Sequence, residues 1–366
     1  HLLITCLGRI IRMYRQLTRR VAVAAACLLP LAVMSLPSHS VDAHSSAAHV
    51  RKTLRVGIVL DVGGIDDKGF NHMAYMGGLA AQKKYGVTFK YIQTTTISDA
   101  LYYANLSTFA RQGYDLVFGI GFLMEPSMYK VAKAYPKVHF GLVDGAPTDA
   151  KGNTVNLPNV ANLFFREQES GYLVGYMAGL MEKNKVGAAK HNVIGAMGGL
   201  SIPPVNRYIA GYYQGARAAD PSVKILLGYS NSFTDQSVSL NLGLHQASKN
   251  ADILFAVAGA AGLGYLKAAQ EKNIYGIGVD SDQAYLGPYM MTSAVKKVDQ
   301  AVLETIGNFA NGKFKGGNNS FNLSNGATGY GTVGKMVPQS IVNQVKAQAK
   351  LVASGKIVPT TVIPKQ

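Results

Sequence analysis

LRVGIVLDVGGIDDKGFNHMAY, residues 54–75, decides the fold of this chain. Residues 54–60 are a hydrophobic strand, and a loop with the glycine pair Gly63 and Gly64 and several aspartates follows it. From Asn71 onward the pattern becomes helical. A buried strand that ends at a glycine-rich loop and leads into a helix is a common ligand site in α/β proteins. Because carboxylates repel phosphate, this loop predicts a ligand with hydroxyl or amine groups.

The rest of the chain repeats this unit. Apolar strands are predicted at 87–93, 116–120 and 138–143, with helices between them. A second series begins near residue 161, with strands at 193–197, 224–229, 253–257 and 275–279. Alternating strands and helices predict parallel sheets with right-handed connections. We therefore expect an α/β fold with two lobes, each a parallel sheet flanked by helices.

The lobe boundaries follow from where the second series starts. We expect a first lobe of residues 54–160 with about 286–312, and a second lobe of residues 161–285 with about 313–366. Residues 311–334 are rich in Gly and Asn and predict a hairpin. Two similar lobes are typical of periplasmic binding proteins of type I, which close on a ligand by a hinge motion.

Residues 1–43 have the character of a signal peptide. Four arginines between positions 12 and 20 precede an apolar run at 21–36, and Val41 and Ala43 fit the small-residue rule for cleavage after Ala43. The run is shorter than the ~20 residues of a spanning helix and contains Pro30, so a membrane anchor is the disfavoured alternative. The sequence predicts an exported protein of the bacterial periplasm.

Both cysteines, Cys6 and Cys27, lie in the predicted signal peptide, so disulfides are not expected in the mature chain. Cys27 follows three alanines, and apolar residues continue after it. A lipid-anchored cysteine normally ends the apolar region, so a lipid anchor is disfavoured.

The formal net charge is +16. Removal of residues 1–43 takes away five arginines and one aspartate, which leaves 31 basic and 19 acidic residues and a charge of +12. The lysines are scattered singly or in pairs, and no basic run alternates with aromatic residues. A solvated basic surface is therefore favoured over a nucleic-acid partner.

The ends of the predicted strands supply the candidate site residues. Ligands of open α/β sheets bind at the carboxyl ends of strands, and several of these positions carry an aspartate, whose oxygens can accept hydrogen bonds from a sugar diol. A turn or a helix cap is the alternative role for any one of them. The candidates are Asp61, Asp66, Asp67, Gly121, Phe122, Asp144, Gly198, Gly199, Gly259, Asp280 and Asp282.

Several segments together resemble the basic membrane protein family. These are substrate-binding proteins of ABC transporters, and their best understood members are purine nucleoside receptors. The resemblance covers nearly all of residues 54–360, in order. The matching segments are 61–71 (DVGGIDDKGFN), 118–122 (FGIGF), 135–140 (YPKVHF), 165–175 (FREQESGYLVG), 276–283 (GIGVDSDQ) and 292–297 (TSAVKK).

The resemblance implies roles for individual residues. In the base-binding part, Asp66 and Asn71 of the first loop would meet the base beside His72, where relatives often have Gln. Tyr75 and Tyr208 would stack on its two faces.

In the sugar-binding part, the resemblance implies that four residues hold the ribose. These are Asp144, Gly259, Asp280 and Lys296.

The expected function is to capture a purine nucleoside and deliver it to an ABC permease and its ATPase, without a cofactor, a metal or catalysis. The alternatives are a receptor for another sugar-like or base-like solute, a nucleoside-hydrolysing enzyme, and an adhesin that uses the basic surface. The acids are spread over separate strand ends, and the sequence has no HExxH, GxSxG or Walker motif, which disfavours the enzyme.

Overall fold

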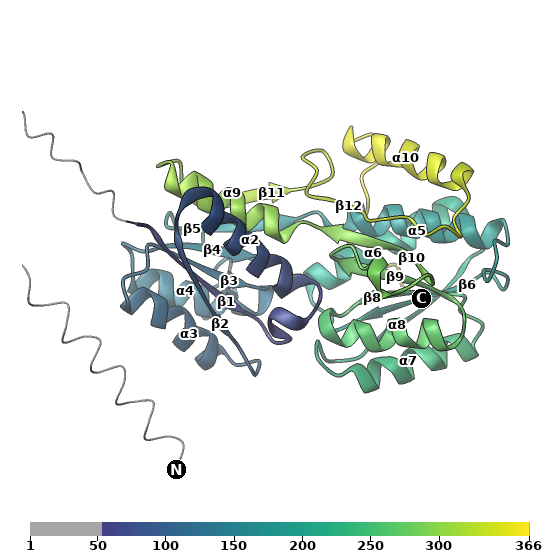
Figure 1. Cartoon of the computed structure of the whole chain (residues 1–366), viewed down its shortest axis with the longest axis horizontal. Helices are drawn as coiled ribbons and strands as arrows, with labels where there is room; N and C mark the ends of the chain where they lie inside the picture. The colour runs from purple at the N-terminus through teal and green to yellow at the C-terminus, as the bar shows by residue number, and fades with distance from the viewer. Residues whose placement is uncertain (1–52, 366) are drawn as a thin grey trace, which may run out of the picture. The chain divides into compact units, whose positions relative to one another are not determined.

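Two six-stranded sheets, each flanked by helices, form two lobes in the computed structural model (Figure 1). The structure describes residues 53–365. The predicted signal peptide and both cysteines lie outside the described residues. The two-lobed α/β architecture expected from the sequence is confirmed.

The sheet of the first lobe has the strand order β11-β5-β4-β3-β1-β2, and all its pairings are parallel. Its central strands are buried on both faces, which explains their continuous apolar sequences. The strands are β1 (Arg55–Leu60), β2 (Thr88–Gln93), β3 (Leu116–Ile120), β4 (His139–Val143), β5 (Val160–Phe165) and β11 (Gly317–Phe321), and the helices are α2 (Phe70–Tyr85), α3 (Asp99–Arg111), α4 (Glu125–Ala134) and α9 (Val298–Ala310).

The sheet of the second lobe has the equivalent order β12-β10-β9-β8-β6-β7. Only β12 runs antiparallel to its neighbour. The strands are β6 (Val193–Gly198), β7 (Lys224–Tyr229), β8 (Ile253–Val257), β9 (Tyr275–Asp280), β10 (Met290–Lys296) and β12 (Thr328–Tyr330), and the helices are α5 (Glu167–Lys183), α6 (Pro203–Ala219), α7 (Gln236–Ser248), α8 (Gly262–Glu271) and α10 (Gln339–Ala353).

Within residues 53–365, the chain crosses between the lobes three times. It passes from β5 to α5, from β10 to α9 and from β11 to β12. Helix α9 consequently packs in the core of the first lobe and α5 in that of the second (Figure 1).

These crossings do not coincide with the lobe boundaries predicted from the sequence. The first lobe comprises residues 54–165 and 298–321, and the second comprises residues 167–296 and 322–365. The expected boundary at 160 would cut off β5, and the one at 286 would assign β10 to the wrong lobe. The hairpin expected at 311–334 is also wrong, because β11 and β12 pair in different sheets. Local patterns show where a strand is but not which sheet it joins.

Helices α5 and α6 approach each other unusually closely. A Cβ atom on Gly171 would lie 2.1 Å from the carbonyl oxygen of Tyr208, and one on Gly215 would lie 2.0 Å from that of Tyr172. Glycine is therefore required at these positions for the backbones to touch. The close contact fixes the start of α6, and with it Tyr208, against the start of α5.

Candidate ligand-binding site

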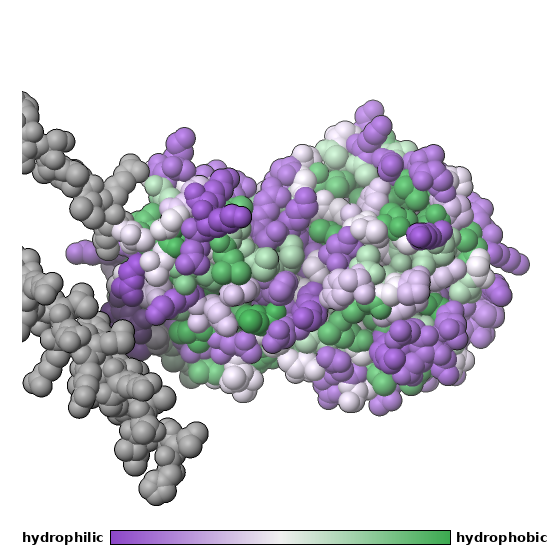
Figure 2. All heavy atoms as spheres, in the orientation of Figure 1, coloured by the Kyte–Doolittle hydropathy of each residue, from purple (hydrophilic) through white to green (hydrophobic). Residues whose placement is uncertain are grey.

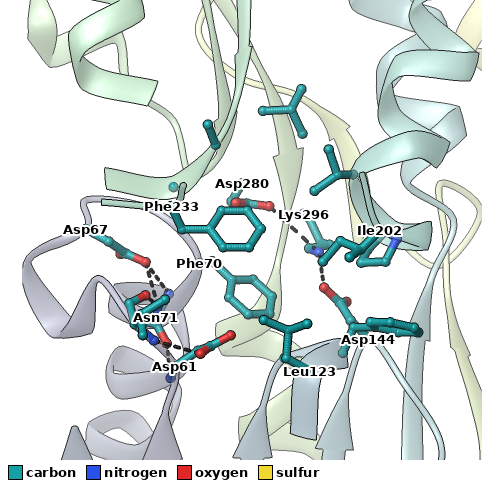
Figure 3. Close-up of a pocket in the computed structure, with 18 of the residues that line it drawn as sticks. Asp61, Asp67, Phe70, Asn71, Leu123, Asp144, Ile202, Phe233, Asp280 and Lys296 are labelled. Carbon is teal, nitrogen blue, oxygen red and sulfur yellow. Dashed lines mark hydrogen bonds and ion pairs between the residues drawn. The ribbon is translucent and has the colours of Figure 1, made fainter. Parts of the chain in front are cut away.

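A cavity lies between the carboxyl ends of the strands of both lobes. It contains about 600 Å³ of empty space, a volume that includes its open mouth. Figure 3 shows side chains from both lobes pointing into it. The lining residues are Asp61, Val62, Asp67, Phe70, Asn71, Gly121, Phe122, Leu123, Asp144, Ile202, Pro204, Val205, Tyr208, Phe233, Val257, Ala258, Gly259, Asp280 and Lys296.

The loop after β1 is held by hydrogen bonds among its own polar residues. The carboxylate of Asp67 accepts from the backbone N–H of Gly69 at 2.9 Å, of Asn71 at 2.8 Å and of His72 at 3.1 Å. Asp67 therefore caps the N-terminus of α2, because the N-cap residue Gly69 has no side chain. Asn71 Oδ1 in turn accepts from the backbone N–H of Asp61 at 2.8 Å.

The hydrogen bonds of Asp61 use only one of its two carboxylate oxygens. Its Oδ1 accepts from the hydroxyl of Tyr102 at 2.5 Å and from the N–H of Val62 at 2.7 Å. Burial raises the pKa of Asp61 to about 6, even though both hydrogen bonds favour the ionised form. Its Oδ2 faces the cavity side, beside Gly121, where a Cβ would lie only 2.9 Å away.

Asp144 and Asp280 occupy equivalent places in the two lobes. Asp144 follows β4, Asp280 ends β9, and β4 and β9 hold the same position in their sheets. Both have a left-handed backbone, with φ of 69° and 62°, which is uncommon for a residue other than glycine and is often found at functional sites. Burial raises the pKa of Asp144 to about 6 and that of Asp280 to about 7.

The ammonium group of Lys296 lies between these two carboxylates (Figure 3). Its Nζ is 2.7 Å from Asp144 Oδ2 and 3.8 Å from Asp280 Oδ1. The rings of Phe70 and Tyr208 have their centroids 4.7 and 5.7 Å from the same Nζ. The nearby carboxylates raise the pKa of Lys296 against the opposing effect of its burial, so the lysine stays charged.

Three phenylalanines supply aromatic surface to the cavity: Phe70, Phe122 and Phe233. Phe70 begins α2 in the first lobe, whereas Phe233 lies in the segment between β7 and α7 of the second. Figure 3 shows both of these rings at the centre of the cavity. Tyr208 is more deeply buried, and its hydroxyl donates to Asp280 Oδ1 at 3.2 Å.

The structure brings most of the predicted site residues together. Those that line the cavity are Asp61, Asp67, Asn71, Gly121, Phe122, Asp144, Tyr208, Gly259, Asp280 and Lys296. The predicted residues that do not line it are Asp66, His72, Tyr75, Gly198, Gly199 and Asp282. Asp66 is exposed, and His72 Nδ1 lies 3.0 Å from the carbonyl oxygen of Ile65.

Tyr75 packs elsewhere, with its ring centroid 5.8 Å from that of Phe89 and 5.1 Å from that of Tyr91. The aromatic surface expected from Tyr75 comes instead from Phe70, five residues earlier. Five positions along a helix turn a side chain to a different face, so the exact position matters.

Two other lining residues lacked a usable signal. Phe233 lies in a loop and has no periodicity, and Ile202 precedes a helix in an ordinary apolar context. The position of Asp61 directly after β1 does indicate a site residue, although the resemblance to the family implied that Asp66 contacts the base instead. The loop hydrogen bonds explain the difference, because they turn Asp61 inward and leave Asp66 exposed.

Comparison with known proteins identifies the family. The family described as "Bmp: ABC transporter substrate-binding protein PnrA-like" matches residues 54–366. The chain belongs to this family. It is 31% identical to the ABC transporter nucleoside-binding protein BmpA of Lactococcus lactis over 336 residues, covering 86% of this chain and 91% of that protein.

Other relatives and solved structures support the same family and fold. An uncharacterized lipoprotein of Pyrococcus furiosus is 31% identical over 322 residues, which cover 81% of this chain and 78% of the relative. A solute-binding protein of an ABC transporter system from Aeropyrum pernix K1 superposes with a TM-score of 0.76 at 26% identity, covering 86% of this chain and 94% of that one. A solute-binding protein from Conexibacter woesei, at 24% identity and a TM-score of 0.68, shares the fold over 85% of this chain and all of that one.

This Bmp protein is therefore an ABC transporter substrate-binding protein. Such proteins bind small solutes and work with a membrane permease and an ATPase. Family and fold indicate solute binding instead of catalysis. Among residues 53–365, no helix has the length and apolar character needed to cross a membrane. In the same part of the chain, no group of three His, Cys, Asp or Glu side chains is arranged to hold a metal ion.

Proposed function

We propose that this protein captures a purine nucleoside in the cavity between its lobes. The observation that carries the proposal is the pairing of two chemistries in one cavity. Aromatic rings from both lobes, Phe70 and Phe233, face a region next to the carboxylates of Asp144 and Asp280. A nucleoside has a planar base for the rings and a diol for the carboxylates.

The base would lie between Phe70 and Phe233. Stacking of a base on an aromatic ring contributes about 1–3 kcal/mol. Asp61 Oδ2 would accept a hydrogen bond from an N–H group at the edge of the base, because Oδ1 is already occupied by Tyr102 and Val62. Because carboxylates repel phosphate, the acids that line the cavity favour an uncharged nucleoside over a nucleotide.

The ribose would lie against Asp144, Asp280 and Lys296. An ionised carboxylate accepts from both hydroxyls of a diol, and the ammonium group donates to a ring or hydroxyl oxygen. The name of the Lactococcus lactis relative, a nucleoside-binding protein, supports the same ligand class. Because Asp144 and Asp280 belong to different lobes, a bound ribose would bridge the lobes and stabilise the closed form, which the permease recognises.

A thermal-shift screen tests this function. Purine nucleosides, the corresponding free bases and simple sugars are each added to the mature protein, and the melting temperature is recorded. We expect nucleosides to raise it more than bases or sugars do. A rise with sugars alone would favour the alternative of a sugar receptor. Incubation with inosine, followed by analysis for free hypoxanthine and ribose, tests the alternative of a hydrolase.

The proposed site of action is the periplasm, outside the cytoplasmic membrane. The sequence favours cleavage after Ala43, whereas the relatives named as lipoproteins favour a lipidated cysteine such as Cys27. Mass spectrometry of the protein purified from its own host distinguishes the two. A mature chain that begins at His44 supports a free receptor, and a diacylglycerol-modified Cys27 supports an anchored one.

A further inference from the structure

The first turn of α5 lies where the three crossings between the lobes meet. The backbone N–H of Arg166 donates to the carbonyl of Phe321 at 2.9 Å, next to the third crossing. Ser170 Oγ donates to the carbonyl of Val295 at 2.7 Å and accepts from the N–H of Gly329 at 2.9 Å. This turn therefore joins the segments that must flex together when the lobes open and close.

Two glutamates of this turn are buried and have different partners. Glu169 Oε2 accepts from the N–H of Leu323 in the third crossing at 2.6 Å and from Thr328 Oγ1 at the start of β12 at 3.1 Å. Its second oxygen lies 3.4 Å from the exposed guanidinium of Arg166. None of these partners lines the cavity. Glu169 therefore links the first turn of α5 to the third crossing and to β12, away from the cavity.

Glu167, in contrast, reaches the ligand site indirectly. Its side chain is fully buried and does not line the cavity. Its Oε1 lies 3.5 Å from Lys296 Nζ, and its Oε2 accepts from Arg207 Nε at 2.6 Å. Arg207 belongs to α6, which the glycine contacts fix against α5. Glu167 thus connects the lysine of the cavity to the rigid pair of helices behind it.

The other two carboxylates around Lys296 are the ones that a ligand would use. Asp144 and Asp280 both line the cavity, so hydroxyl groups of a bound solute compete with Lys296 for them. Glu167 is the third carboxylate within 4 Å of Lys296 Nζ, and a ligand in the cavity does not reach it. The ion pair between Glu167 and the ammonium group of Lys296 consequently persists when the ligand binds.

We propose that Glu167 is a positioning residue, which holds the ammonium group of Lys296 at the cavity wall through both ligand binding and hinge closure. Arg207 balances the buried charge of Glu167, since a buried carboxylate without a partner would be costly. The inference rests on the proposed function only in its choice of ligand, because the contacts themselves involve no ligand.

The first experiment compares Glu167→Gln with Glu169→Gln, a neighbouring buried glutamate of the same turn. The affinity for inosine and guanosine is measured by calorimetry. Loss of a hydrogen bond to a charged group predicts that E167Q binds about tenfold or more weakly. E169Q is expected to lower the melting temperature and keep the affinity of the wild type. Equal affinities for E167Q and the wild type would contradict the inference.

A second readout separates positioning from a general structural role. The negative charge of Glu167 is one cause of the raised pKa of Asp144, which also faces Lys296 and Arg207. E167Q should therefore lower the pKa of Asp144, so the melting temperature of the unliganded protein should fall less steeply between pH 4 and pH 7 than in the wild type. E169Q should keep the profile of the wild type. This measurement tests the role of Glu167 even if the protein binds no nucleoside. Failure to bind nucleosides would count against the proposed function alone.

A double variant covers the case in which E167Q does not fold. Glu167→Gln with Arg207→Gln removes both charges of the pair and leaves two amides that can bond to each other. The double variant is expected to fold and to bind inosine about tenfold or more weakly. Wild-type affinity in the folded double variant would overturn the role of Glu167.

Discussion

Lys296 Nζ and Asp144 Oδ2 lie 2.7 Å apart across the two lobes, although 152 residues separate them in the sequence. Both side chains are almost completely buried. The attraction of Lys296 lowers the pKa of Asp144, yet burial outweighs it and raises the value to about 6. Lys296 therefore stabilises the ionised form of Asp144, but not enough to offset the cost of burying this carboxylate.

Asp144→Asn tests the sugar-binding role of this pair. Asparagine keeps the size of the side chain and tolerates the left-handed backbone at this position. It cannot offer an ionised acceptor to a diol, so the affinity for inosine should fall about ten- to hundredfold. Calorimetry measures the affinity, and the melting temperature checks the fold. Asp149→Asn, in an exposed loop, is the matched control and should bind normally. Normal binding by D144N would remove Asp144 from the site.

The aromatic assignment is tested by comparing Phe233→Ala with Tyr75→Ala. Loss of one stacked ring should cost about 1–3 kcal/mol of nucleoside binding. Tyr75 packs on Phe89 and Tyr91 away from the cavity, so its loss should leave the affinity unchanged and lower stability only. Fluorescence titration with guanosine measures both variants. The reverse result, with Y75A impaired and F233A normal, would restore the assignment made from the sequence.

The affinity for nucleosides should depend on pH. Burial raises the pKa of Asp280 to about 7 and that of Asp61 and Asp144 to about 6, compared with 3.8 for an exposed aspartate. The folded protein therefore holds protons that the unfolded chain has lost, and the unliganded protein loses stability as the pH rises from about 4 to 7. Ligand hydroxyls donate to the ionised carboxylates, so affinity should increase over pH 5 to 8.

Calorimetric titrations with inosine at pH 5, 6, 7 and 8 check this dependence. Repeating the titration at pH 6 in buffers with different ionisation enthalpies should show that binding releases protons. An affinity that is constant over this range, with no proton release, would show that the three aspartates do not act as ionised acceptors.

A second contact joins the two lobes. Ser281 Oγ donates to the carbonyl of Lys68 at 2.6 Å, and Gln283 Nε2 lies 3.4 Å from the same oxygen. Ser281→Ala removes the shorter bond, so ligand release should become several-fold faster with little change in the association rate. Stopped-flow measurements give both rates. Ser248→Ala, whose hydroxyl bonds within its own helix end, is the control. Unchanged release in S281A would show that this contact does not hold the lobes together.

Much of the fold was predictable because its signals are local. The strand from Arg55 to Leu60 is apolar since both faces of its sheet are covered, and the same holds for β3 and β8. The sheet membership of β5, β10 and β11 was not predictable, because pairing depends on contacts between residues far apart in the sequence. Figure 2 shows hydrophilic residues spread over the viewed face of both lobes, with apolar residues between them.

The site was predictable where a strand ends and unpredictable where a side chain must be oriented. Asp144 follows β4 and Asp280 ends β9, so both could be found as acids at strand ends. The choice among Asp61, Asp66 and Asp67 required the hydrogen bonds of the loop, which turn one carboxylate inward, use one as a cap and leave one exposed. Glu167 had no signal in the sequence, because its role depends on where Lys296 and Arg207 lie in space.

The most direct test of the account is a calorimetric titration of the mature wild-type protein with inosine, 2′,3′-dideoxyinosine and ribose. The account predicts saturable binding of one inosine per chain, much weaker binding of the dideoxy compound, which lacks the diol, and weak binding of ribose, which lacks the base. No heat with inosine or any other purine nucleoside, together with saturable binding of ribose or another sugar, would contradict it.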